Sequence, residues 1–170
     1  ADGLVHTDYT ELKEALPDDL EQKLVSAEKL AIGWIETRTE KEMELYNTLV
    51  EVTHNIIAEA FSKKVITPGT TTTDDVVWWM RQKVTDMGLE TWFHPTVDIQ
   101  RSSEALKSHI YSFTKGDKSK VIQPGDLLHC DFGITYIGLN TDCQQHAYVL
   151  KEGEDEVPKY LRKAFANGNR

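Results

Sequence analysis

The sequence has little positive charge, only two cysteines and no long apolar run. Its 19 Lys and Arg residues are outnumbered by 28 Asp and Glu residues, which gives a net charge of −9. This balance argues against nucleic acid as a partner, because nucleic-acid binding needs a basic face, and against anionic membrane surfaces. No apolar run approaches the roughly 20 residues of a membrane-spanning helix. Internal repeats, low-complexity segments and a visible signal peptide are also absent.

What is present is the composition of an ordinary globular chain. Its 170 residues suffice for about one domain, and 39% hydrophobic residues allow a modest core. Apolar periodicity and capping residues predict helices that start near Thr7, cover residues 39–61, cover residues 73–87 and start at Pro158. Residues 89–98 have the composition of a strand, which Pro95 would break or place at a sheet edge. Residues 25–35 fit either a helix or a short strand with turns.

The most informative stretch is residues 125–150, GDLLHCDFGITYIGLNTDCQQHAYVL, which predicts a β-hairpin. The first strand would cover residues 126–135 and the second residues 140–150. Asp131 and Asp142 are eleven residues apart, and the midpoint between them falls at the predicted reversal. Residues equidistant from the centre of a hairpin face each other, with Cβ atoms about 5 Å apart. We therefore expect the two carboxylates to lie close together on one face.

Two carboxylates this close repel each other, and one of them holds its proton unless a cation neutralises the pair. Oxygen ligands suit Mg, Mn or Zn, so the pair predicts a divalent-metal site. A helix would align residues eleven apart equally well, but Gly133 and Gly138 argue against a helix here. Two alternatives stay open. The aspartates could be exposed on a polar sheet face without a ligand, or they could join His129 and His146 in a metal site that this chain completes by itself.

The two cysteines, Cys130 and Cys143, each adjoin one of these aspartates. They are also equidistant from the predicted hairpin centre, so we expect them to face each other on the opposite side of the sheet. Two buried thiols acting as small apolar residues are the favoured interpretation, and a cross-strand disulfide is the alternative.

The segment GDLLHCDFG at residues 125–133, the second aspartate at Asp142 and ITPGTT at residues 66–71 occur in this order. They resemble the pita-bread metallopeptidase family, which comprises Xaa-Pro dipeptidases, aminopeptidase P and methionine aminopeptidases. That family places its first two metal ligands in GD-apolar-D-x-G and in an Asp eleven residues later, after a PG-x-T segment that leads into a helix. From Tyr46 onward the chain follows the family's order.

The resemblance implies an α+β, partial pita-bread fold, with an antiparallel hairpin carrying the metal aspartates and helices packed on one face. Residues 1–38 would be a linking segment and residues 39–170 the first half of a catalytic domain. Asp131 would hold one divalent metal ion and Asp142 would bridge two, with Mn favoured and Co or Zn as alternatives. The family completes its site with a His and two Glu further along, and the chain ends at Arg170 before they could occur. We therefore expect no catalytic residue within this chain and no activity of the isolated chain.

The activity that the resemblance implies is hydrolysis of an N-terminal Xaa-Pro-type bond in a short peptide. For the protein itself, we expect a cytoplasmic location, and a homodimer is compatible with the resemblance. Two departures from the family concern the substrate. Cys143-Gln144-Gln145 stands where dipeptidases have x-T/S-R, and Thr114 stands at the usual place of a substrate-contacting His, which leaves His109 as the candidate for substrate binding. The alternative function is a non-catalytic binding module on the same fold.

Overall fold

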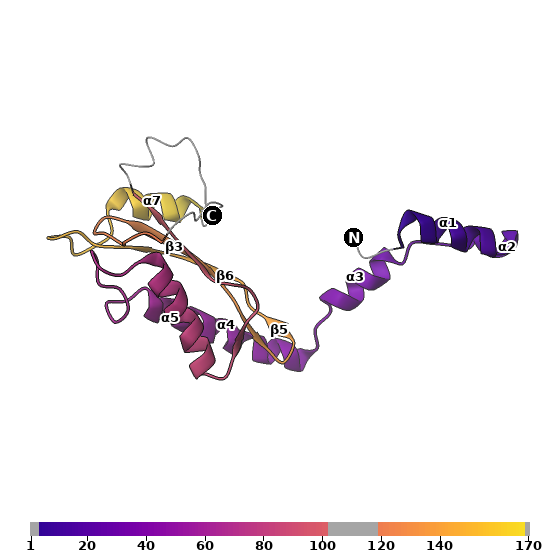
Figure 1. Ribbon diagram of the computed structural model, residues 1–170, viewed down its shortest axis with the longest axis horizontal. Helices are drawn as coiled ribbons and strands as arrows, with labels where there is room; N and C mark the ends of the chain where they lie inside the picture. The colour runs from indigo at the N-terminus through magenta and orange to yellow at the C-terminus, as the bar shows by residue number, and fades with distance from the viewer. Residues whose placement is uncertain (1–3, 102–118, 169–170) are drawn as a thin grey trace. The chain divides into compact units, whose positions relative to one another are not determined.

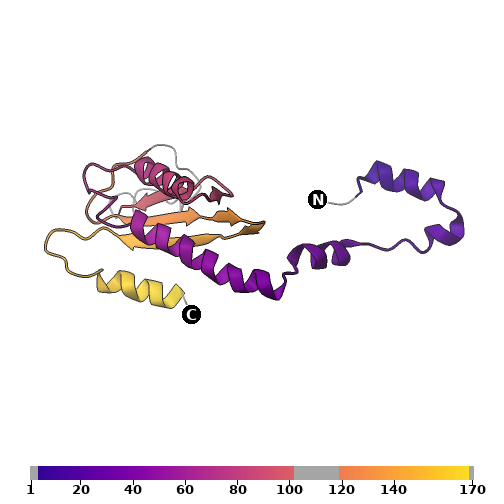
Figure 2. The same cartoon turned by 90° about the horizontal axis from the view of Figure 1, so that it is seen from below.

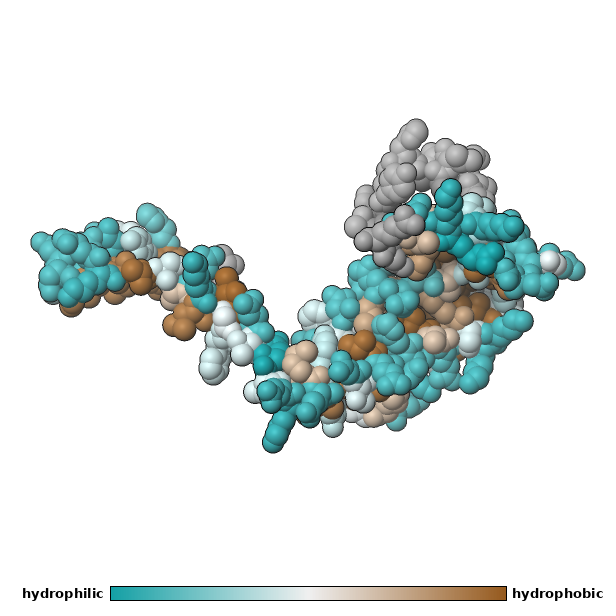
Figure 3. Space-filling model, turned by 180° about the vertical axis from the view of Figure 1, so that it is seen from behind, coloured by the Kyte–Doolittle hydropathy of each residue, from teal (hydrophilic) through white to brown (hydrophobic). Residues whose placement is uncertain are grey.

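The computed structural model describes residues 4–101 and 119–168. The chain divides into two compact units, residues 1–43 and residues 44–170. The first unit contains α1 (His6–Ala15), α2 (Asp18–Glu21) and α3 (Glu28–Glu36) (Figure 1). The helix α3 decides the open alternative for residues 25–35 in favour of a helix. None of these three helices buries a residue, and their apolar side chains lie on the surface (Figure 3), including Leu20, Leu30 and Trp34.

The long helix predicted for residues 39–61 is α4 (Glu40–Ala60). It begins with a capping box, in which the Glu42 amide donates to Oγ1 of Thr39 at 3.3 Å and the Glu42 carboxylate accepts from the Thr39 amide at 2.6 Å. The buried residues on its inward face are Leu49, Thr53, Ile56, Ile57 and Ala60.

The second predicted helix is α5 (Thr73–Asp86), and its N-cap is Thr72. The Asp75 amide donates to Oγ1 of Thr72, and the Asp75 carboxylate accepts from the Thr72 amide, which satisfies two donors that the helix itself leaves free. The helix ends before Gly88, whose φ of +68° is accessible to glycine without strain. No helix among the described residues is long and apolar enough to cross a membrane.

The strands form two small antiparallel sheets, ordered β1-β4-β5 and β2-β3-β6. Their bounds are β1 (Glu90–Thr91), β2 (Thr96–Gln100), β3 (Leu127–Phe132), β4 (Ile134–Tyr136), β5 (Leu139–Asn140) and β6 (Cys143–Tyr148). The strand predicted for residues 89–98 is therefore interrupted, and Pro95, which lacks an amide donor, lies in the interruption. The hairpin consists of β3 and β4 running out and β5 and β6 running back.

The register of the hairpin differs from the predicted one by two residues. Asp131 pairs with Gln144, not with Asp142, because the centre of the hairpin lies between Ile137 and Gly138, one residue later than the predicted midpoint. Both turn residues have positive φ, +43° and +81°, which is the backbone of a two-residue hairpin turn. A shift of two keeps every side chain on its predicted face, since the side-chain period of a strand is two.

The core lies between the hairpin and one layer of helices. The helices α4 and α5 cover the same side of the strands, and Figure 2 looks onto that side. Phe132, Leu128 and Cys130 of β3 belong to one buried core cluster with Ile56 of α4 and Met80 of α5. The last helix, α7 (Lys159–Gly168), lies on the other side (Figure 1), where the ring of Phe165 is 5.5 Å from that of His146.

The two cysteines are buried free thiols, as expected. They do not face each other directly, since Cys130 pairs with Gln145 and Cys143 pairs with Phe132. The prediction of a direct cross-strand cysteine pair was wrong for the same reason as the aspartate register. Burial raises the pKa of the Cys130 thiol to about 12, so it stays protonated and behaves as an apolar residue.

Candidate metal centre

The face of the β2-β3-β6 sheet that points away from α4 and α5 is polar. Successive strand side chains point to opposite faces, so His129 and Asp131 lie on the face opposite Leu128 and Cys130, which are in the core. The paired positions on the neighbouring strands add Thr96 and Asp98 from β2 and Gln144 and His146 from β6. Three strands therefore gather polar and ionisable side chains on one side of the sheet.

The structure brings Asp131 and Asp142 together at one end of this face. Burial raises the pKa of Asp131, and so do the charge of Asp142 and a hydrogen bond that the two carboxyl groups share when one is protonated; His129 partly offsets these effects. Oδ2 of Asp131 accepts from Nε2 of Gln144 at 3.4 Å. Its other oxygen, Oδ1, is buried without a hydrogen-bond partner among the described residues.

This pair fits a divalent cation. No ion pair between described residues involves Asp131 or Asp142. A cation would neutralise the two charges and would bind Oδ1 of Asp131, which lacks a hydrogen-bond donor among the described residues. Carboxylate oxygens are suitable ligands for Mn or Mg. Within residues 4–101 and 119–168, no three His, Cys, Asp or Glu side chains form a group that could hold a metal ion. The two aspartates alone would therefore supply only part of a metal-ligand set.

The alternative of a site completed by His129 and His146 was wrong. The two imidazole rings lie side by side, with centroids 4.9 Å apart, but they do not join the aspartates in a metal-binding group. Nε2 of His129 is 3.2 Å from Oε1 of Gln144. Because Oε1 can only accept, His129 donates from Nε2, and the Gln144 amide bridges His129 and Asp131. The candidate substrate-binding residue His109 lies outside the described residues.

The sequence did not indicate three features beside the pair. Gln144 was visible only as a departure from the family pattern, and its bridging role depends on the register. Asp98 faces His129 from β2, and burial raises its pKa. The Trp92 indole lies against Gly133, so close that a Cβ at Gly133 would be 2.3 Å from its Nε1. These contacts join segments distant in sequence, which no local pattern reveals.

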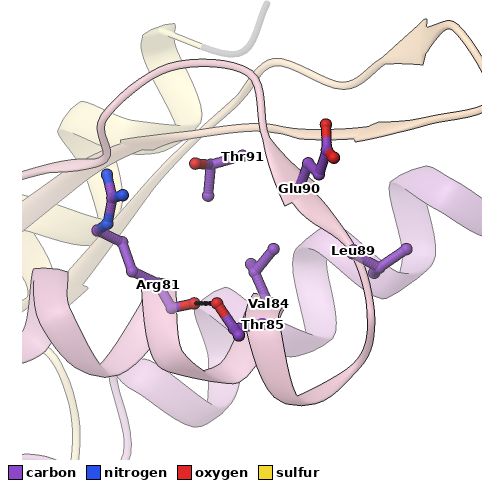
Figure 4. Close-up of a pocket in the computed structure, with 6 residues that line it drawn as sticks. All are labelled: Arg81, Val84, Thr85, Leu89, Glu90 and Thr91. Carbon is purple, nitrogen blue, oxygen red and sulfur yellow. Dashed lines mark hydrogen bonds between the residues drawn. The ribbon is translucent and has the colours of Figure 1, made fainter.

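A surface pocket of about 310 Å³ lies elsewhere, between α5 and β1. Figure 4 shows that Arg81, Val84 and Thr85 come to it from the helix, while Leu89, Glu90 and Thr91 come from the segment after it. Neither candidate metal ligand lines this pocket, so it is separate from the metal centre.

We expect Asp131→Asn to raise the free energy of unfolding of the metal-free chain at neutral pH. Because the pKa of Asp131 is raised in the folded state, its ionisation costs more in the folded than in the unfolded chain. That cost is present above the folded-state pKa and disappears below the ordinary carboxyl pKa. The stabilisation should therefore be full near pH 7 and shrink near pH 4 in urea denaturation. Asp155→Asn, at an exposed position, is the control. Equal effects of the two variants on the free energy of unfolding at pH 7 would contradict the raised pKa of Asp131.

The structure is an α+β, partial pita-bread fold, with a carboxylate pair on the polar face of an antiparallel sheet. The chain belongs to metallopeptidase family M24, whose family model matches residues 34–167. No curated protein sequence matches this chain.

Solved structures show the same fold at low sequence identity. Aminopeptidase P from Escherichia coli superposes with a TM-score of 0.66 at 13% identity, over 98% of this chain and 37% of that one. X-Pro aminopeptidase from Thermotoga maritima gives 0.62 at 16% identity, over 94% and 46%. Prolidase from Thermococcus sibiricus gives 0.59 at 16% identity, also over 94% and 46%. The chain thus spans less than half the length of these structures.

Proposed function

We propose that this chain supplies the two-aspartate part of a dinuclear metal site in a peptidase that hydrolyses an N-terminal Xaa-Pro-type bond. The observation that carries the proposal is the coupled Asp131–Asp142 pair, in which one buried oxygen has no donor among the described residues. Membership of a metallopeptidase family supports peptide hydrolysis. The names of the neighbours, X-Pro aminopeptidase, prolidase and aminopeptidase P, support the Xaa-Pro preference and short peptides as substrates.

Within this chain, the proposed roles are binding and orientation. Asp131 and Asp142 would hold the cations, with Mn favoured over Co and Zn, and Gln144 would orient Asp131 through its Nε2–H group. When bound, the divalent cations would polarise the peptide carbonyl and lower the pKa of a water molecule. We assign no general acid or base to this chain. Further ligands would lie outside the described residues. A homodimer and a cytoplasmic location stay predictions from the resemblance.

The second candidate function is a non-catalytic binding module. The observation that favours it is the pair Gln144-Gln145, which replaces the hydroxyl and the Arg of the dipeptidase pattern. The carboxylate pair favours the enzyme, because a domain that only binds a partner gains nothing from two like charges whose proximity raises a pKa.

The proposal predicts weak but localised Mn²⁺ binding by this chain. In a titration followed by paramagnetic broadening of amide signals, the signals of Asp131 and Asp142 should broaden first, and Asp131→Asn should require at least about tenfold more Mn²⁺. The control Asp155→Asn should titrate like the wild type. Broadening that Asp131→Asn leaves unchanged would contradict the proposed site. With Mn²⁺ present, the chain alone should not hydrolyse an Xaa-Pro dipeptide, and hydrolysis that Asp142→Asn abolishes would show a complete site instead.

A further inference from the structure

A chain of buried hydroxyl groups connects α4 to the residue before Asp142. Thr53 and Thr141 are both completely buried, and their Oγ1 atoms are 2.8 Å apart. Thr53 Oγ1 also lies 2.8 Å from the carbonyl oxygen of Leu49. On the hairpin side, Oγ1 of Thr141 is 3.0 Å from the amide nitrogen of Ile134.

The proton directions in this chain follow from the partners. The Leu49 carbonyl can only accept, so Thr53 donates its single hydroxyl proton there. Thr141 must then donate to Oγ1 of Thr53. The lone pairs of Thr141 are left to accept from the Ile134 amide. Each hydrogen bond in this network therefore has only one possible donor, so the buried network has a single stable arrangement.

This network acts where the sheets provide no strand pairing. Thr141 and Asp142 lie in the break between β5 and β6, opposite the break at Gly133 between β3 and β4. Two bonds between Thr141 and Ile134 cross this break, from the Thr141 amide to the Ile134 carbonyl at 2.9 Å and from the Ile134 amide to Thr141 Oγ1. The hydroxyl of Tyr46, also on α4, donates to the Asn140 carbonyl at 2.9 Å.

Anchoring Thr141 also sets the direction of the Asp142 side chain. Adjacent residues of an extended segment point to opposite sides, so fixing Thr141 on the α4 side directs Asp142 to the polar side. We propose that Thr53 and Thr141, assisted by Tyr46, are positioning residues that hold Asp142 in place for metal binding. This inference rests on the proposed function, because it assumes that Asp142 is a ligand. It assigns to α4 a role in the proposed metal centre, although no residue of α4 is among the candidate ligands.

The Mn²⁺ titration described above tests this role. Thr53→Val keeps the shape of the side chain but cannot receive the proton of Thr141, so it should raise the Mn²⁺ concentration at half-broadening about tenfold, as loss of ligand support does elsewhere. Thr141→Val should act alike. Thr53→Ser restores the hydroxyl and should stay within about twofold of the wild type. Thr85→Val, which removes an exposed hydroxyl bonded within α5, should have no effect.

The outcomes separate the two proposals. If Asp142→Asn abolishes the localised broadening while a folded Thr53→Val protein titrates like the wild type, the metal site stands and the positioning role is wrong. An equal shift for Thr53→Ser and Thr53→Val would also overturn it, because packing rather than the hydroxyl would then matter. If the valine variants do not fold, Tyr46→Phe removes only the Asn140 contact, and an unshifted titration of that variant overturns the proposal. Absence of localised broadening in the wild type would overturn both proposals.

Discussion

Asp126→Asn should lower the free energy of unfolding by about 3 kcal/mol, because it breaks a largely buried ion pair. The Asp126 side chain is fully buried, and its carboxylate accepts from Nε and Nη2 of Arg101 at 2.7 and 2.8 Å and from the Gln123 amide at 2.7 Å. An asparagine would turn its NH₂ group towards one of these donors and would remove the negative charge that the guanidinium group contacts. Urea denaturation followed by tryptophan fluorescence measures the loss.

The control is Asp155→Asn, which makes the same chemical change at an exposed carboxylate. It should alter the free energy of unfolding by less than about 0.5 kcal/mol. A similar small change for Asp126→Asn would mean that the pair with Arg101 contributes nothing beyond solvation. Because Asp126 immediately precedes β3, we also expect Asp126→Asn to loosen the start of the strand that carries Asp131.

Gly133→Ala should lower the free energy of unfolding by about 3 kcal/mol, at the upper end of the costs of inserting a methyl group into packed structure. A Cβ at this position would lie 1.9 Å from the carbonyl oxygen of Thr141 and 2.3 Å from Nε1 of Trp92. The oxygen belongs to the backbone, so relief requires the two arms of the hairpin to separate at the break beside Asp142. We therefore expect the wavelength of maximum tryptophan emission to change together with the loss of stability, because the surroundings of Trp92 change.

Gly33→Ala is the matched control for this substitution. No atom lies within 4 Å of a Cβ at Gly33, which is inside α3, so alanine should be neutral or stabilising by up to about 1 kcal/mol. A Gly133→Ala protein as stable as the wild type would show that the hairpin arms yield without cost, and that the close approach of Trp92 does not constrain the site.

The helices that flank the site could be predicted because their signals are local. The apolar spacing of α4 and its Thr39 cap lie within one stretch of sequence. The N-cap of α5 could not be read from the sequence, because Thr72 and Thr73 give the same signal and only the reciprocal bonds with Asp75 identify Thr72. The face shared by Asp131 and Asp142 followed from the strand period alone.

The register and the supporting contacts could not be predicted for a physical reason. The turn uses Ile137 at φ +43°, a conformation that β-branched residues rarely adopt, so Gly138 indicated a reversal but its exact centre could not be predicted. The contacts that hold the site join distant residues, as Thr53 and Thr141 do across 88 positions. Whether such pairs meet depends on how the helices and sheets pack, which is not encoded in any short motif.

The pleat of the hairpin also separates two kinds of potential ligand that the sequence places side by side. Cys130 and Cys143 adjoin Asp131 and Asp142, yet both thiols are buried on the core side. With a pKa of about 12, the Cys130 thiol offers no thiolate at physiological pH. Thiophilic ions such as Zn²⁺ or Cu⁺ thus gain no sulfur ligand at the proposed centre. The polar side would present the carboxylate oxygens of Asp131 and Asp142 to an incoming ion, and such hard ligands favour Mn²⁺ and Mg²⁺.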